Sequence, residues 1–94
     1  MAIEFTESAD KHGIPHEYAI HVLTHALNRR QTDGRPGDVT IAFVGRPHDL
    51  SRDFIEVIAA YTSAGKIVVF HVNYLTDKWS WLLYEPDCQP WEEN

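Results

Sequence analysis

The stretch from Phe54 to Tyr74 constrains the fold most, because it is the most apolar part of the chain and a Ser-Ala-Gly turn divides it into two arms. Both arms are rich in β-branched and aromatic residues, which is typical of half-buried strands. Gly65 supplies the positive φ that a tight turn between strands usually needs. We therefore expect a β-hairpin at the centre of the core, with Glu56 and His71 as the polar residues that interrupt it.

Helical spacing of apolar residues marks the segment from Pro15 to about Arg29, and Pro15 suits the first position of a helix because it lacks an N–H donor. Before it, Thr6 to Lys11 is expected to form one or two helical turns with Thr6 as the N-cap. A second stripe at helical spacing predicts a short C-terminal helix, with an alternating strand as the other interpretation; the stripe consists of Leu75, Trp79, Leu82 and Leu83.

Three strands are expected in the second half of the chain, at 39–44, 54–62 and 66–74, and Ile3 to Phe5 adds at most an edge strand. Turn residues make 31–38 and 45–53 loops. Because the connections are short, the strands pair antiparallel. The sequence thus predicts an α+β fold in which N-terminal helices pack on one face of a small antiparallel sheet of three to four strands, followed by a short C-terminal helix.

The length of 94 residues allows one domain, which we place at 1–85, followed by an acidic tail at 86–94. The single cysteine, Cys88, cannot form an internal disulfide, which fits a reducing compartment. The N-terminus lacks the basic residues of a signal peptide, and no apolar run reaches the roughly 20 residues of a membrane span. We expect a cytoplasmic protein that does not contact a membrane.

The formal charge of −6 argues against a protein that binds nucleic acid through bulk electrostatics, which requires clustered Lys and Arg. A local basic site is still compatible with the sequence. Arg29, Arg30 and Arg35 cluster near the middle of the chain, and Arg46 and Arg52 follow closely.

Six histidines are a high share for this length. His21 and His25 have the i, i+4 spacing of metal ligands on a helix, but no Cys or Glu-x-x-His partner completes a site, so a solvated helix face is the simpler interpretation. His12 and His16 flank a turn and are interpreted as polar residues of a loop and a helix start. We expect no metal and no cofactor, because phosphate-binding glycine loops, nucleophile elbows and Cys/His pairs are all missing from the sequence.

His71 and Glu56 lie inside predicted strands, where polar residues are uncommon. Strand alternation places His71 on one face with Val69 and Asn73. A structural histidine is one interpretation, and a general acid or base, or a phosphate contact, is the other. Glu56 is either an outward-facing or ion-paired strand residue or part of the same site. Whether Glu56 and His71 share a face depends on the register of the hairpin.

Two groups of segments resemble the BrnT-like toxins, within the RelE/ParE group of bacterial type II toxin–antitoxin toxins. The first is Ile3-Glu-Phe-Thr followed by Lys11-His-Gly-Ile-Pro-His-Glu-Tyr-Ala19. It is similar to the opening of that family, an aromatic strand followed by a Lys-His-Gly element that leads into a helix. The second group resembles the family's later strands and consists of Val44-Gly-Arg46, Phe54-Ile-Glu-Val57 and Lys66 to Asn73.

This resemblance implies a small ribonuclease toxin that cuts mRNA, either free or on the ribosome, and so blocks translation. It also implies a small antitoxin protein as partner, with any contact to DNA made only through the antitoxin. The positions that match the family's pattern are Lys11, His12, Glu17 and Glu56, with Arg52 matched less securely.

For metal-independent RNA cleavage, a base removes the proton of the 2′-hydroxyl and a cation stabilises the phosphorane. We assign the base to Glu56 or His71, and the cationic role to Lys11, Arg46 or Arg52. A non-catalytic protein-binding module with a toxin-like fold is the alternative. A small enzyme that uses the His71/Glu56 face on another substrate is a third hypothesis.

Overall fold

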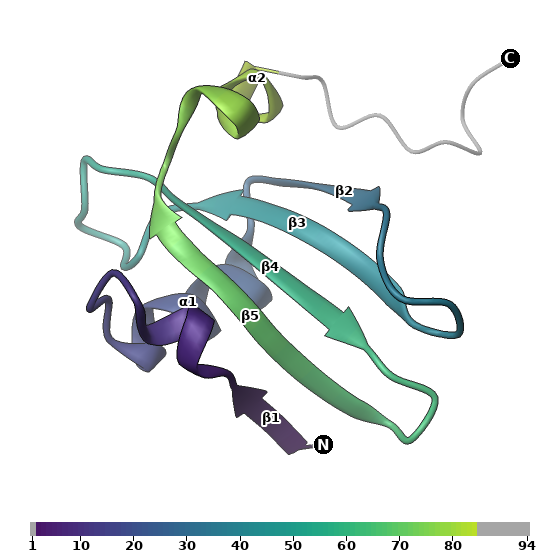
Figure 1. Cartoon of the computed structure of the whole chain (residues 1–94). Helices are drawn as coiled ribbons and strands as arrows, with labels where there is room; N and C mark the ends of the chain where they lie inside the picture. The colour runs from purple at the N-terminus through teal and green to yellow at the C-terminus, as the bar shows by residue number, and fades with distance from the viewer. Residues whose placement is uncertain (1, 85–94) are drawn as a thin grey trace, which may run out of the picture.

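A computed structural model describes residues 2–84 of the chain, so the expected tail at 86–94, with Cys88, lies outside the described residues. The elements are a 3-10 helix, two α-helices and five strands (Figure 1). In chain order they are β1 (Ala2–Phe5), η1 (Glu7–Asp10), α1 (His16–His25), β2 (Asn28–Thr32), β3 (Val39–Gly45), β4 (Ile55–Tyr61), β5 (Lys66–Tyr74) and α2 (Asp77–Tyr84).

The strands form one sheet in the order β1-β5-β4-β3-β2. Strands β2 to β5 pair antiparallel with their sequence neighbours, whereas β1 runs parallel to β5. The α+β class and the central hairpin are therefore confirmed, and Gly65 has the expected positive φ, at 81°. The expected sheet of three to four antiparallel strands is too small, because β1 and β2 extend it to a mixed sheet of five.

The first α-helix ends at His25 instead of continuing to Arg29, and β2 begins at Asn28. The chain leaves the helix because its backbone pairs with β3: the Leu27 N–H donates to the Val44 carbonyl at 2.9 Å, and Asn28 stands opposite Val44. Polar edge strands such as this one lack the alternation that reveals half-buried strands. The prediction of a loop at 31–38 is accordingly wrong for its first two residues.

The helices lie on opposite faces of the sheet, not on one face as expected (Figure 1). On β3, Phe43 packs in the core under η1 and α1, whereas Ala42 and Val44 pack under α2. Both faces of this strand are apolar, so each face needs a cover. The predicted helix at the C-terminal end is confirmed, with buried Trp79 and Leu82.

A β-bulge in β5 decides which side chains share a face. Ile58 pairs with His71 and Ala59 pairs with Val69, so Phe70 is the extra residue. Val69 therefore points to the α1 side of the sheet, whereas His71 lies on the α2 side with Ile58. The prediction that His71 shares a face with Val69 is wrong, because simple alternation does not hold across a bulge.

Within residues 2–84, neither α-helix combines the length and the hydropathy that crossing a bilayer requires.

Candidate functional site

Glu56 lies in the middle strand β4 and is almost completely buried, with 3% of its side chain exposed. It stands between Val44 of β3 and Asn73 of β5, on the face that α2 covers. Burial of an ionised carboxylate is costly unless hydrogen bonds replace its water. The contacts of Glu56 therefore determine what this position does.

Three hydrogen bonds satisfy the Glu56 carboxylate. Its Oε1 accepts from the backbone N–H of Thr76 at 2.8 Å and from the Thr76 hydroxyl at 2.7 Å. Its Oε2 lies 2.6 Å from Nε2 of His71. Thr76 directly precedes α2, and its carbonyl accepts from the N–H groups of Trp79 and Ser80. The carboxylate thus joins β4, β5 and the start of α2 at one point.

His71 has a defined orientation because Glu56 holds one of its ring nitrogens. An ionised carboxylate only accepts hydrogen bonds, so Nε2 of His71 carries the hydrogen in this contact. The other nitrogen, Nδ1, makes no hydrogen bond within the described residues. The side chain is 31% exposed, so solvent reaches it. A buried carboxylate that orients a half-exposed imidazole is the arrangement that general bases use.

A second histidine lies beside the first. The rings of His12 and His71 are edge to face, with centroids 6.3 Å apart. Strand β1 pairs with β5 only as far as Val69, which leaves the following part of β5 at the sheet edge, where the loop after η1 brings His12. Of the positions carried over from the resemblance, His12 and Glu56 thus both lie beside His71. Apart from the resemblance, the sequence pattern indicated only that His12 is a polar loop residue.

The three candidate cations are exposed and lie in loops. Lys11 directly follows η1, and Arg52 lies between β3 and β4. Arg46 follows the end of β3, and its guanidinium carbon is 5.5 Å from the ring centroid of Phe54, two residues before Glu56. No hydrogen bond or ion pair in the described part of the chain joins these cations to Glu56 or His71.

The other histidines have structural contacts. His21 stacks on His25 with centroids 4.6 Å apart, and its two nitrogens contact the Arg46 carbonyl at 3.0 Å and the Asp49 carboxylate at 3.1 Å. These contacts attach the β3–β4 loop to α1. His16 contacts the Asp10 carboxylate and stacks on Phe5. Among residues 2–84, no group of three or more potential ligands is placed to hold a metal ion.

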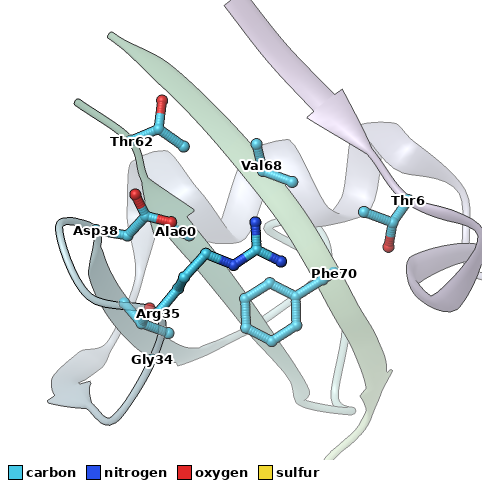
Figure 2. A pocket seen from close by; sticks show the side chains of 9 residues that line it. Thr6, Gly34, Arg35, Asp38, Ala60, Thr62, Val68 and Phe70 are labelled. Atoms are coloured by element: carbon cyan, nitrogen blue, oxygen red, sulfur yellow. The ribbon is translucent and has the colours of Figure 1, made fainter. Parts of the chain in front are cut away.

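A hollow of about 320 Å³ lies on the same sheet face as Glu56 and His71, next to the bulge (Figure 2). The sequence did not point to it, because its walls come from segments far apart in the chain. It is lined by Thr6, Gly34, Arg35, Asp38, Thr40, Ala60, Thr62, Val68 and Phe70.

Comparisons with protein-family profiles, with curated proteins and with solved structures gave no match.

Proposed function

We propose that this protein is a metal-independent ribonuclease that acts as the toxin of a type II toxin–antitoxin system. The observation that supports the proposal most directly is the 2.6 Å contact between His71 Nε2 and the buried Glu56 carboxylate. The sequence resemblance to BrnT-like toxins supplies the substrate, RNA, and the physiological setting.

In the proposed reaction, Nδ1 of His71 accepts the proton of a ribose 2′-hydroxyl. The 2′-oxygen attacks the adjacent phosphorus, and the bond from phosphorus to the 5′-oxygen of the next nucleotide breaks. Glu56 stabilises the imidazolium that forms, as carboxylates do in other histidine-dependent enzymes. The products are a 2′,3′-cyclic phosphate and a 5′-hydroxyl end.

The leaving 5′-oxygen needs a proton, and we assign its delivery to His12, whose ring is 6.3 Å from that of His71. A histidine suits this role because it changes protonation near neutral pH. The negative charge on the phosphorane needs a cation. Arg46 is the first candidate because its guanidinium lies over Phe54, close to Glu56 in the chain, with Lys11 and Arg52 as the others.

Expression in bacteria tests the toxin proposal. The wild-type chain is expected to stop growth, and His71→Gln or Glu56→Gln is expected to remove the effect while the protein still accumulates in folded form. Co-expression of the neighbouring small open reading frame is expected to restore growth through an antitoxin. Normal growth on expression of the wild-type chain would count against the toxin, and continued arrest by both variants would refute the assigned dyad.

A non-catalytic protein-binding module is the second candidate, supported by the surface around the outer strand β2. Leu27 and Trp81 are 51% and 41% exposed, and Arg30 lies over the Trp81 ring at 5.1 Å. Exposed aromatic and apolar side chains beside an edge strand suit a protein partner. If Leu27→Ser abolished partner binding while the dyad variants changed nothing in cells, this candidate would replace the first.

A further inference from the structure

The hollow beside the bulge continues the face that carries the proposed catalytic residues. Thr40 pairs with Ala60, and Ala60 pairs with Val68. Because residues two apart on a strand share a face, these side chains lie on the same face as Ala42, Ile58 and Glu56. Helix α2 covers the part of this face near Val44 and Ile58 and leaves the remainder to the β2–β3 loop. Phe70, at the wall of the hollow, directly precedes His71. The wall of the hollow is thus one residue from His71 along β5.

The β2–β3 loop places Arg35 across the strands (Figure 2). In the close-up, the guanidinium extends over the sheet toward Val68 and Phe70. Gly34 fixes the base of the loop, since a Cβ there would come within 1.9 Å of the Thr40 hydroxyl. The Asp38 N–H also donates to the Arg35 carbonyl at 3.1 Å, which closes the loop as a turn. The loop thus holds the backbone at Arg35 in place, and the Arg35 side chain is exposed.

Arg35 has a charged head without a charged partner. Within residues 2–84, its guanidinium forms no ion pair, no hydrogen bond and no cation–π contact. The hollow is also lined by the apolar side chains of Ala60 and Val68, the ring of Phe70, and three threonines. A planar cation and an aromatic ring that line the same apolar hollow match a flat, hydrogen-bonding ligand.

The volume limits the size of that ligand. Sites for drug-sized molecules range from about 300 to 1,000 Å³, so about 320 Å³ is at the small end and suits a single ring system with its sugar. Proteins recognise single-stranded RNA by stacking exposed bases on aromatic rings and arginine guanidinium planes. Threonine hydroxyls can donate to and accept from the edge of a base.

We propose that this hollow binds one nucleobase, stacked between the Phe70 ring and the Arg35 guanidinium, and so positions an RNA strand for attack at the adjacent His71. The inference rests on the proposed function for its substrate class, RNA. It adds a base-binding subsite that places a nucleotide next to the reacting phosphate. Stacking explains why a planar guanidinium is used here, where a lysine would supply the same charge.

The test is fluorescence anisotropy with short single-stranded oligonucleotides whose 2′-O-methyl groups prevent cleavage. Removal of a stacking partner costs about 1–3 kcal/mol per base, so Arg35→Ala and Phe70→Ala are expected to weaken binding about 5- to 150-fold. Arg35→Lys keeps the charge but not the plane and is expected to weaken binding nearly as much. Arg29→Ala, which removes an equal charge from an exposed position in β2, is the matched control and is expected to change binding less than twofold.

Phe70→Leu is measured as well, in case Phe70→Ala does not fold. Leucine preserves apolar bulk but removes the ring, so Phe70→Leu is also expected to weaken binding. Full retention of affinity by Arg35→Lys would overturn the stacking arrangement. Equal weakening by Arg29→Ala, or no binding of the oligonucleotide by the wild type, would overturn the subsite. Free mononucleotides serve as competitors: competition at micromolar concentration would assign the hollow to free nucleotides and overturn its role in RNA binding.

Cleavage of all-ribose RNA, measured in parallel, separates the two proposals. If the wild type cleaves RNA and Arg35→Ala leaves kcat/KM unchanged, the subsite is wrong and the proposed function stands. If the 2′-O-methyl strand binds in an Arg35-dependent way but ribose RNA stays intact, the proposed function is wrong and the base-binding hollow stands.

Discussion

Glu56 and Thr76 are joined by two hydrogen bonds to a single carboxylate oxygen, at 2.8 Å from the backbone N–H and 2.7 Å from the hydroxyl. This pair ties the start of α2 to the middle strand of the sheet. The same carboxylate holds His71 through its other oxygen, at 2.6 Å. Thr76 therefore acts as a positioning residue for the proposed base.

Thr76→Val removes the hydroxyl donor but keeps the side-chain shape and the backbone N–H. Hydrogen bonds to charged groups contribute about 1.5–3 kcal/mol, so the free energy of unfolding is expected to fall by about that amount. Chemical denaturation followed by circular dichroism measures the change. Thr24→Val on the exposed face of α1, where the hydroxyl contacts only its own helix and a neighbouring histidine, is the control and should change stability by less than about 0.5 kcal/mol. Equal stability of the two variants would show that the Thr76 hydroxyl contributes nothing.

Gly34→Ala is expected to destabilise the protein through a clash. The new Cβ would lie 1.9 Å from Thr40 Oγ1 and 2.8 Å from its Cβ, and Thr40 is buried. Forced overpacking costs about 1–3 kcal/mol. Thermal or chemical unfolding measures the loss, and adding Thr40→Ala should recover part of it because the closest atom disappears. If Thr40→Ala lowered the stability of Gly34→Ala further and recovered none of it, the clash with Thr40 would not be the cause.

Gly65→Ala is expected to destabilise the hairpin for a different reason. Its φ is +81°, whereas nothing lies within 4 Å of an added Cβ, so only backbone strain opposes the substitution. The left-handed region costs a residue with a Cβ about 1–2 kcal/mol. Gly65→Asn should lose less, since asparagine visits this region more readily. If asparagine and alanine destabilised the protein equally, backbone strain at Gly65 would not be the cause.

The central hairpin, strand β3 and helix α2 were predictable because local patterns specify them. The strands are rich in β-branched and aromatic residues, apolar residues recur at helical spacing in α2, and Gly65 marks the turn. Strand β2 was not predictable, because its Asn-Arg-Arg-Gln-Thr sequence pairs at a sheet edge through backbone groups that any residue supplies. The parallel pairing of β1 with β5 joins the two ends of the fold and has no local signature.

The candidate site was predictable only in part. Glu56 and His71 stand out as polar residues within apolar strands, so their selection required no structure. Their contact required the bulge at Phe70, which alternation cannot reveal. His12 and Thr76 reach the site through a loop and a helix start, respectively, and the hollow beneath Arg35 depends on the β2–β3 loop.

His12→Gln separates the acid from the base in the proposed reaction. Loss of a general acid is expected to lower the rate of RNA cleavage about 100- to 10,000-fold. An RNA analogue with a sulfur leaving group in place of the 5′-oxygen needs little protonation, so cleavage of that analogue should be restored in His12→Gln but not in His71→Gln. If the sulfur analogue rescued both variants or neither, the assignment of His12 as the acid would be wrong.

The most direct measurement of the central claim is RNA cleavage by the purified protein in the presence of a metal chelator. We predict fragments that end in a 2′,3′-cyclic phosphate, and a rate that falls about 100- to 10,000-fold in His71→Gln while the fold is retained. Intact RNA after incubation with the folded wild-type protein, or equal cleavage by His71→Gln, would contradict it.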